Sequence, residues 1–463
     1  NIWMAEKAEK GEMEILHSFP DAFFEEDFPR PDAVWAADIN PMFIGSYTSM
    51  ADVKKAHRTL ENALYATEKL ASAVACQGLL PYPAAGFKEA QEALLFAAFH
   101  DTLAGTISKT PEQEALRSIN YGLEVLARIR TRAFYAIASR QPAAAEGSLP
   151  IFVYNPHPYP VHTVLECEYT LPDYNWENFT FSPLLYHEGD PVPCQTERES
   201  GNVPIEFRKR LSFVADLAPM AMERYDLCFE KVPKFRPSAK LVEGENFRFS
   251  NGSMEVEIDH ATGLVSRYTV DGQPIARENF GRLVVYQDNV DPWGMICKSI
   301  PQEIGAFALM TPAEAAEFAS VPAETLCPVQ VVEDGPVRTV VEALFRYHHS
   351  DARLRYMLPK EGNGFDVEVT VYWHEHDKML RLHLPTAFHH ASYYGQTMFG
   401  VNSLKDNGEE MVHQKWAAAV DGASSTAMTV INDSIHGLFC KEEGLYLSLL
   451  RSPAYAAMPV LDF

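Results

Sequence analysis

Apolar residues recur at helical spacing between residues 46 and 143. In the first helical stretch they are Val53, Leu60, Leu64, Ala71 and Val74, which fall on one face of a helix. The segment GLLPYPAAG interrupts this pattern with two prolines, and we expect a second helix over about 87–99. A third helix carries its apolar face at Leu116, Ile119, Leu123, Leu126, Ala133 and Ile137. Three amphipathic helices with short connections predict an antiparallel bundle over 46–143.

Two of these helices have start signals. Ser49, followed three residues later by Asp52, resembles a capping box and predicts Ser49 as the N-cap of the first helix. In KTPEQEAL, Thr110 is expected to cap the third helix, with Pro111 at its first position and Gln113 completing the box.

The apolar period changes to two after SRQPAAAEGSLP, the segment 139–150 that we interpret as a linker. Leu165, Cys167, Tyr169 and Leu171 alternate with polar residues, as do the apolar positions of 365–373. Such alternation is typical of half-buried strands in antiparallel sheets. A proline-containing stretch near 235–245 divides the region into a first β domain, 150–238, and a larger β-sandwich, 239–463. The predicted fold class is α+β and multidomain: a three-helix bundle followed by antiparallel β-sandwich domains.

Composition and charge narrow the classes of partner. The formal net charge is −24, which repels phosphate backbones, so we expect no nucleic-acid partner. No apolar run approaches the roughly 20 residues that span a bilayer, so no membrane partner is expected. The seven cysteines are scattered without a CxxC pair, which favours reduced thiols and a cytoplasmic location. A homo-oligomer is left open.

The string FAAFHDTLAGTIS places His100 beside Asp101 at the end of an apolar helical run, just before a glycine turn. In one interpretation this is a helix end meeting water, where the helix dipole favours a histidine. In the other, His100 is a metal ligand and Asp101 a substrate contact. The residues alone leave both open.

Two further segments carry polar candidates. His374 and His376 lie two apart on a predicted strand, but no third ligand accompanies them, so we interpret them as a solvated strand end. The segment QDNVDPWGM offers Asp288, Asp291 and Trp293, either as a sugar-facing loop or as a structural turn with a packed indole.

Several strings together resemble glycoside hydrolase family 38, the α-mannosidases and mannosylglycerate hydrolases. FHDTLAGT is similar to the family's HD-x-x-x-GT string, and GSYTS (Gly45 to Ser49) to the string that opens its helical domain. VYNPHPYPV, EIDHATGLVSRYTVDGQPI, VYWHEHDKMLRLHLP and INDSIHGLFCKEEGLYLSLLRSPAY resemble segments of its β region, in the same order. The resemblance covers nearly all of the chain.

This resemblance implies a catalytic α/β barrel, then a three-helix bundle, then β-sandwich domains. It implies a zinc ion that binds two hydroxyls of a mannosyl unit, with His100 as one metal ligand and Asp101 as a contact to sugar hydroxyls. Tyr47 and Arg451 could also reach the sugar in a full enzyme. The implied reaction is retaining hydrolysis of an α-mannosyl bond by two carboxylates.

The family's nucleophile, general acid and remaining metal ligands come from the barrel, upstream of the bundle. We therefore expect residues 1–45 to be the tail end of the barrel, both catalytic carboxylates to be absent, and the chain to be inactive alone. We also expect truncation at the C-terminus, since the sequence stops just after a predicted strand. The alternative is a stand-alone carbohydrate-binding or assembly module.

Overall fold

The computed structural model describes residues 2–14, 21–22, 43–175, 179–199, 201, 206–233, 240–241, 245–288, 291–294 and 297–453. The chain divides into two units, Asn1–Asn40 and Pro41–Phe463. The first unit contains helix α1 (Ile2–Glu9). Most of the segment 1–45 lies outside the described residues, so its assignment to a barrel stays a prediction.

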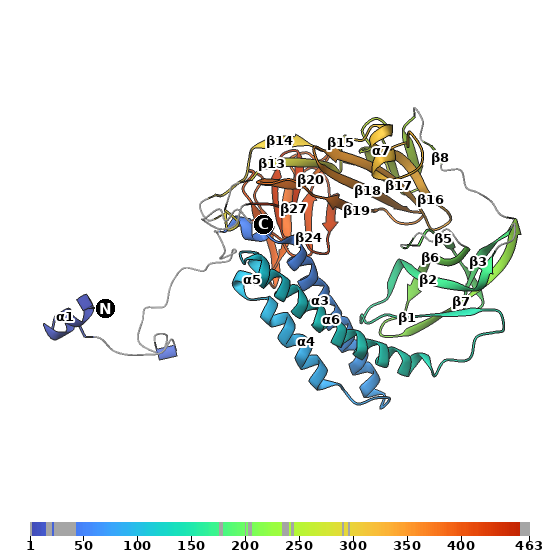
Figure 1. The fold of residues 1–463 in the computed structure, drawn as a ribbon, viewed down its shortest axis with the longest axis horizontal. Coiled ribbons are helices and arrows are strands. Elements are labelled where there is room, and N and C mark those ends of the chain that lie inside the picture. The colour runs from blue at the N-terminus through green and yellow to red at the C-terminus, as the bar shows by residue number, and fades with distance from the viewer. Residues whose placement is uncertain are drawn as a thin grey trace. The chain divides into compact units, whose positions relative to one another are not determined.

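Long helices lie side by side at the start of this unit (Figure 1). The helical elements are η1 (Ile44–Tyr47), α3 (Ala51–Cys76), α4 (Ala84–Ala97), α5 (His100–Ala104) and α6 (Lys109–Ala138). Leu60, Phe87, Ile119 and Leu126 lie in one shared core between α3, α4 and α6. A Cβ on Gly122 of α6 would lie 3.1 Å from the Leu60 methyl groups, so this glycine permits close packing of α6 on α3. The predicted helices and their apolar faces are confirmed.

Both predicted capping boxes are wrong. Helix α3 has Met50 as its N-cap, in the left-handed region with φ 51°, and no side chain caps it. The Ser49 hydroxyl instead lies within hydrogen-bond distance of two carbonyl oxygens outside the helix, those of Gly45 and Pro292. Helix α6 begins at Lys109 with Ser108 as N-cap, so Thr110 already lies in its first turn.

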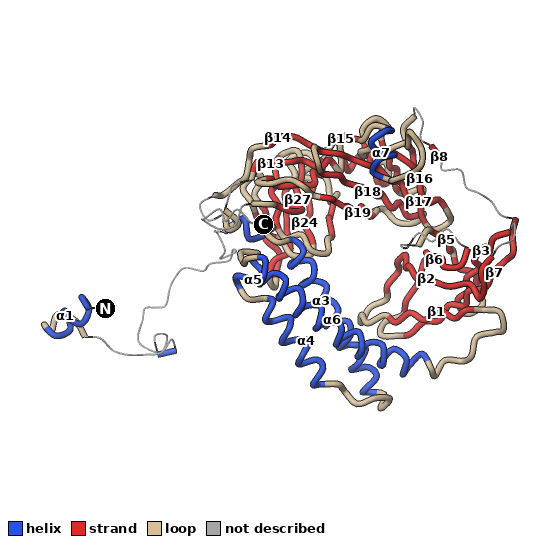
Figure 2. The backbone as a smooth tube through the Cα atoms, in the orientation of Figure 1, coloured by secondary structure: helices blue, strands red, loops and turns tan. Residues whose placement is uncertain are grey.

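Strands begin at Leu149 and first form two sheets with a common core (Figure 2). One sheet has the order β1-β7-β3-β4 and the other β2-β6-β5, with every pair antiparallel. The strands are β1 (Leu149–Tyr154), β2 (Val161–Asn175), β3 (Phe179–His187), β4 (Asp190–Val192), β5 (Cys194–Glu197), β6 (Glu206–Leu217) and β7 (Met222–Pro233). Tyr169, Leu185, Phe213 and Leu227 come from both sheets and pack together. The arrangement is a β-sandwich.

The larger β region forms further antiparallel sheets around a second core. One has the order β19-β18-β17-β16-β8, with β15 paired to β17, and a second the order β14-β13-β20-β27-β26-β23. Smaller sheets have the orders β12-β11-β10-β9 and β22-β21-β24-β25. Val256, Tyr356, Leu380 and Leu445, drawn from several of these sheets, share one core.

The strands of this region are β8 (Lys240–Leu241), β9 (Phe247–Ser250), β10 (Met254–Ile258), β11 (Val265–Val270), β12 (Gln273–Ala276), β13 (Arg282–Gln287), β14 (Glu303–Ala306), β15 (Ala308–Leu309), β16 (Val329–Asp334), β17 (Arg338–Tyr347), β18 (Ser350–Pro359), β19 (Asp366–Tyr372), β20 (Lys378–Pro385), β21 (Ser392–Thr397), β22 (Gly400–Leu404), β23 (Met411–Val412), β24 (Trp416–Val420), β25 (Ala427–Ile431), β26 (Gly437–Lys441) and β27 (Gly444–Arg451). A short helix, α7 (Pro312–Phe318), joins β15 to β16. The α+β fold class is confirmed.

The predicted alternation of apolar and polar residues is confirmed in β2 and β19. Strand β19 ends at Tyr372, however, so His374 and His376 follow the strand rather than share one of its faces. The expected division near 235–245 falls mostly outside the described residues. The domain limits drawn from the sequence stay predictions.

Candidate functional site

His100 and Asp101 open the short helix α5. The apolar helix before them, α4, ends at Ala97, so the expectation that His100 ends that helix is wrong, and the helix dipole does not explain it. The His100 side chain is 74% exposed and its Nε2 lies 3.6 Å from Asp101 Oδ2. Its ring packs on the Phe99 ring, with the centroids 4.2 Å apart. A histidine and a carboxylate therefore project together at an accessible turn.

The backbone of this turn is fixed against the segment before α3. Gly105 ends α5 with φ 76°, and a Cβ there would lie 2.3 Å from the carbonyl oxygen of Ser49. Lys54 of α3 donates to the Leu103 carbonyl at 2.8 Å and also to the Ser49 carbonyl. Burial and, to a smaller extent, the nearby Arg451 together lower the pKa of Lys54 to about 7. The two strings that carry the resemblance are thus in direct contact.

Arg451, at the end of β27, joins this region to the larger β region. Its guanidinium forms two hydrogen bonds with the Asp288 carboxylate, at 2.8 and 2.6 Å, and both side chains are fully buried. It also donates to the carbonyls of Pro292 and Asp291, each at 3.0 Å. A Cβ on Gly45 would lie 1.8 Å from Arg451 Nη1, so only glycine permits this approach.

These contacts bear on two predicted sugar-binding residues. Arg451 uses its donors on the protein itself, so the geometry favours a structural role and gives its predicted sugar contact no support. Tyr47 is 8% exposed and lies in η1, next to the same junction. The segment with Asp288 and Asp291 is a structural turn, since Asp291 accepts from the Trp293 amide and the Trp293 ring contacts Phe43.

Among the described residues, no group of three or more His, Cys, Asp and Glu side chains could hold a metal ion. His100 and Asp101 supply one imidazole and one carboxylate, which fit at most part of a tetrahedral zinc site. His374 and His376 flank Glu375, which is paired with Lys378 at 2.8 Å. A metal at His100 would need most of its ligands from elsewhere.

Large exposed apolar side chains precede the His100 turn in the sequence. Leu95, Phe96 and Phe99 are 62%, 67% and 52% exposed, respectively. They are consecutive or nearly so in the sequence and directly precede His100. Several large apolar side chains exposed in one segment are typical of a surface that binds another domain or protein, rather than of a surface that stays in contact with solvent.

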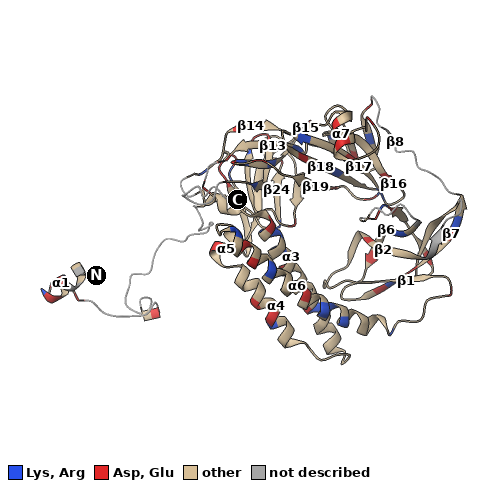
Figure 3. Cartoon of the chain, viewed as in Figure 1, with Lys and Arg blue, Asp and Glu red and all other residues tan. Residues whose placement is uncertain are grey.

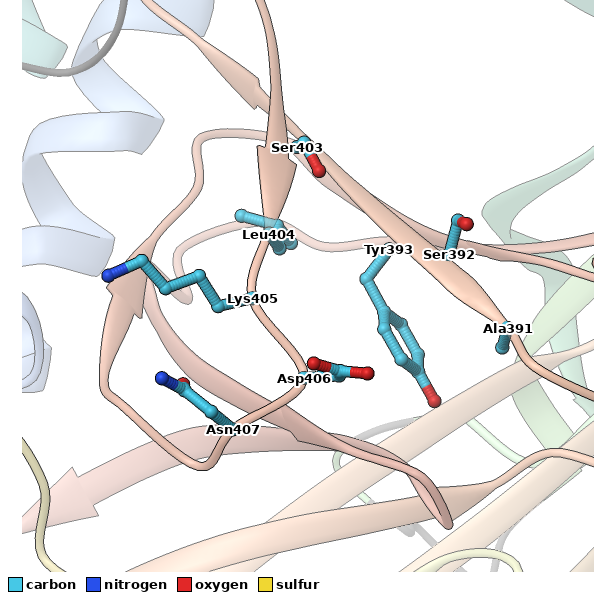
Figure 4. Close-up of a pocket in the computed structure, with 8 residues that line it drawn as sticks. All are labelled: Ala391, Ser392, Tyr393, Ser403, Leu404, Lys405, Asp406 and Asn407. Atoms are coloured by element: carbon cyan, nitrogen blue, oxygen red, sulfur yellow. The ribbon is translucent and has the colours of Figure 1, made fainter.

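A separate pocket of about 380 Å³ lies in the larger β region (Figure 4). It is lined by Ala391, Ser392, Tyr393, Ser403, Leu404, Lys405, Asp406 and Asn407. Tyr393 is only 1% exposed and its hydroxyl donates to the Lys441 carbonyl. The pocket therefore lacks an exposed aromatic face on which a sugar ring could stack, and neither His100 nor Asp101 lines it.

Sequence reasoning missed Lys54 and the pairing of Arg451 with Asp288. Lys54, His57, Arg58 and Glu61 share a stripe of α3 beside the apolar one. This polar stripe was the available signal in the sequence. In the structure part of the stripe is buried, since Lys54 and Arg58 are only 5% and 4% exposed. The partner of Arg451 lies 163 residues away in the sequence, and no periodicity indicates it.

Two family models match separate parts of the chain. The alpha mannosidase middle domain matches residues 42–137, and the glycosyl hydrolases family 38 C-terminal domain matches residues 249–458. The chain belongs to glycoside hydrolase family 38. No curated protein matches it.

Solved structures share the fold. A glycosyl hydrolase family 38 protein from Enterococcus faecalis is 14% identical with a TM-score of 0.71, and the match covers 96% of this chain and 58% of that one. An alpha-mannosidase from Enterococcus faecalis V583 is 13% identical with a TM-score of 0.72, covering 96% and 57%. The chain thus spans less than two thirds of the length of either structure.

Charge and hydropathy add little to this picture. Acidic and basic residues are mixed along the helices and strands of the second unit (Figure 3). Within the described ranges, no helix is both long and apolar enough to cross a membrane.

Proposed function

We propose that this chain supplies the helical and β domains of a retaining, metal-dependent glycoside hydrolase that cleaves terminal α-mannosyl linkages, and that the chain alone is inactive. The exposed His100–Asp101 pair carries the proposal, since the family's HD string occurs here on an accessible and well-fixed turn. The exposed apolar residues Leu95, Phe96 and Phe99 support it, because a catalytic domain docked there would bury them.

Each residue of the pair has a distinct role in this proposal. The His100 imidazole is one ligand of a zinc ion, which would bind two sugar hydroxyls and withdraw charge from them. Asp101 accepts hydrogen bonds from sugar hydroxyls, where a carboxylate forms stronger bonds than a neutral acceptor. We assign neither the nucleophile nor the general acid to the described residues.

The proposed partners are a mannoside or oligosaccharide substrate, with neither nucleic acid nor membrane. The scattered cysteines support a cytoplasmic location.

The test compares zinc content and α-mannoside hydrolysis in this chain and in a longer protein that carries a family 38 barrel before it. We expect the longer protein to bind zinc and cleave, and this chain to do neither. His100→Ala and Asp101→Asn should then reduce activity in the longer protein, and His100→Ala should also reduce its zinc content. The matched control is His376→Ala, an exposed histidine with no assigned role.

Unchanged zinc content and rate in His100→Ala would show that the pair is only a solvated helix start. Binding of mannosides by this chain without any barrel would favour the alternative, a stand-alone carbohydrate-binding module.

A further inference from the structure

We propose that Lys54 is a positioning residue for the His100–Asp101 turn, and that through Ser49 it sets this turn relative to the end of strand β27. The role for catalysis rests on the proposed function, whereas the positioning itself does not. Three sets of contacts carry the inference.

The first contact joins α3 to the turn. Lys54 Nζ donates to the Leu103 carbonyl at 2.8 Å, across 49 residues of sequence. Leu103 lies in the last turn of α5, where carbonyls have no partner within the helix. The ammonium therefore satisfies a carbonyl that would otherwise be exposed or unpaired, three residues from His100.

The second contact joins the same ammonium to Ser49, whose carbonyl it also binds. Gly105 also packs closely against that carbonyl, since a Cβ there would lie 2.3 Å from the oxygen. The lysine and the glycine that ends α5 therefore both contact the Ser49 carbonyl. A shift of Ser49 must shift the turn.

The third contact joins Ser49 to the β region. Its hydroxyl lies 2.8 Å from the Pro292 carbonyl, to which Arg451 Nη1 also donates at 3.0 Å. Arg451 is fixed in turn by Asp288. A continuous set of hydrogen bonds therefore runs from β27 through Ser49 and Lys54 to α5.

Burial of a lysine side chain carries a desolvation cost that an apolar side chain of similar size avoids. We therefore attribute the presence of Lys54 at this position to its hydrogen bonds. Lys54 is 5% exposed, and the cation Arg451 acts on it electrostatically. The titratable ring of His436 also interacts with Lys54, but it is neutral near pH 7 because burial, Arg58 and Lys54 lower its pKa to about 4. A methionine of similar length would avoid the desolvation of an ammonium. What methionine cannot supply is the pair of directed bonds to Ser49 and Leu103.

The test measures amide hydrogen exchange in this chain. At pH 6, where Lys54 is mostly charged, exchange at residues 99–106 in Lys54→Met should be at least ~10-fold faster, the change expected if a hydrogen bond to a charged group of ~1.5–3 kcal/mol is lost. Exchange in α4 and α6 should not change. The matched control is Lys55→Met, the neighbouring and exposed lysine, which should leave residues 99–106 as they are. Unchanged exchange at 99–106 in Lys54→Met would overturn the proposal.

A pH profile separates this role from simple packing. When the turn opens, Lys54 meets water and regains its ordinary pKa near 10.5, whereas in the closed state the pKa is about 7. The open state therefore binds more protons between these values, and the closed turn gains stability as pH rises from 7 towards 9. Protection of 99–106, corrected for intrinsic exchange, should rise with pH in the native chain and stay flat in Lys54→Met. A flat native profile would also overturn the proposal, even if Lys54→Met fails to fold.

The barrel-containing protein separates the two proposals. There, Lys54→Met should weaken zinc binding, with activity recovered at high zinc. If Lys54→Met loosens the turn while His100→Ala leaves zinc and rate intact, the proposed function fails and the positioning stands. If His100→Ala abolishes both while exchange in Lys54→Met is unchanged, only the positioning fails.

Discussion

Two buried arginines join parts of the second unit, and they do so by different chemistry. Arg451 joins the end of β27 to Ser49, between η1 and α3, whereas Arg338, at the start of β17, joins the larger β region to the first sandwich. Arg451 pairs with the Asp288 carboxylate, binds the main-chain carbonyls of Pro292 and Asp291, and lies 3.5 Å from the Ser49 hydroxyl. Arg338 binds the carboxylates of Glu197 and Glu166.

The Arg338 junction is dominated by side-chain charge. Arg338 Nε donates to Glu197 Oε1 at 2.8 Å, and the Glu197 side chain is 0% exposed. Burial opposes ionisation of Glu197, but the bond and charge of Arg338 outweigh it and lower the pKa of this carboxyl. Gln195 completes the junction by accepting from the amides of Val337 and Arg338.

The difference indicates two kinds of task. At Arg338, ion pairs between side chains hold the first sandwich and the larger β region together. None of these side chains belongs to the candidate site. At Arg451, bonds to carbonyls fix the path of the backbone through Pro292 and Ser49, which leads to His100. The two junctions should therefore respond differently to substitution, one in global stability and the other in local order.

The largest effect is expected for Arg338→Met. It leaves the Glu197 carboxylate buried without its main partner, which costs ~3–5 kcal/mol in similar cases. Chemical denaturation of this chain measures the loss, while hydrogen exchange at 99–106 should stay native. The control is Arg267→Met, since Arg267 and its partner Glu255 are 60% and 57% exposed and such pairs contribute little. A loss below ~1 kcal/mol would mean that Arg210, also near Glu197, replaces Arg338.

Next in size is Gly105→Ala, which acts on the other junction. Alanine at φ 76° costs ~1–2 kcal/mol, and its Cβ would meet the Ser49 carbonyl. We expect a total loss of ~2–3 kcal/mol, with faster exchange in 99–106. Gly147→Ala is the control: it shares a positive φ of 83° but has no neighbour within 4 Å of the added Cβ. Equal losses in the two variants would show that the contact with Ser49 contributes nothing.

The sequence predicted the fold well where periodicity carries the information. The apolar stripe of Val53, Leu60 and Val74 faces the core as expected, because burial of that stripe drives helix packing. The start of α3 was mispredicted because Ser49 has a stronger competing use, its contacts with Gly45 and Pro292. A local pattern could not show a partner 243 residues away.

The candidate site was predicted only in part for the same reason. His100 and Asp101 stand out as adjacent titratable residues in a string that resembles a family motif, and the structure places them on an exposed turn. Their helix was misplaced because Ala98 and Phe99 continue the apolar pattern although α4 has already ended. The Arg451–Asp288 pair arises only from tertiary contact, so its structural role was not predictable from residue type.

The smallest expected effect is a dependence of stability on pH that arises from two buried histidines, His413 and His436. They interact with Arg58 of α3, and we call this region the bundle junction. His413 is 0% exposed, and Asn432 donates to its Nε2 at 2.9 Å, which fixes the neutral ring. Burial, with His436 next, lowers the pKa of His413 to about 3, and burial with Arg58 and Lys54 lowers that of His436 to about 4. The junction therefore excludes protons that the unfolded chain accepts.

The unfolded chain binds protons at these histidines below about pH 6.5, whereas the native chain does not until about pH 4, so stability falls as pH drops through this window. Between pH 7 and 5 the native chain should lose ~1–2 kcal/mol more than His413→Gln, in which one such group is absent. Denaturation midpoints at the two pH values measure the difference. His374→Gln, at an exposed histidine, controls for titration elsewhere. If His413→Gln loses as much stability between pH 7 and 5 as the native chain, His413 already binds its proton in the folded state. The bundle junction would then tolerate a buried charge, as the junction at Arg338 does.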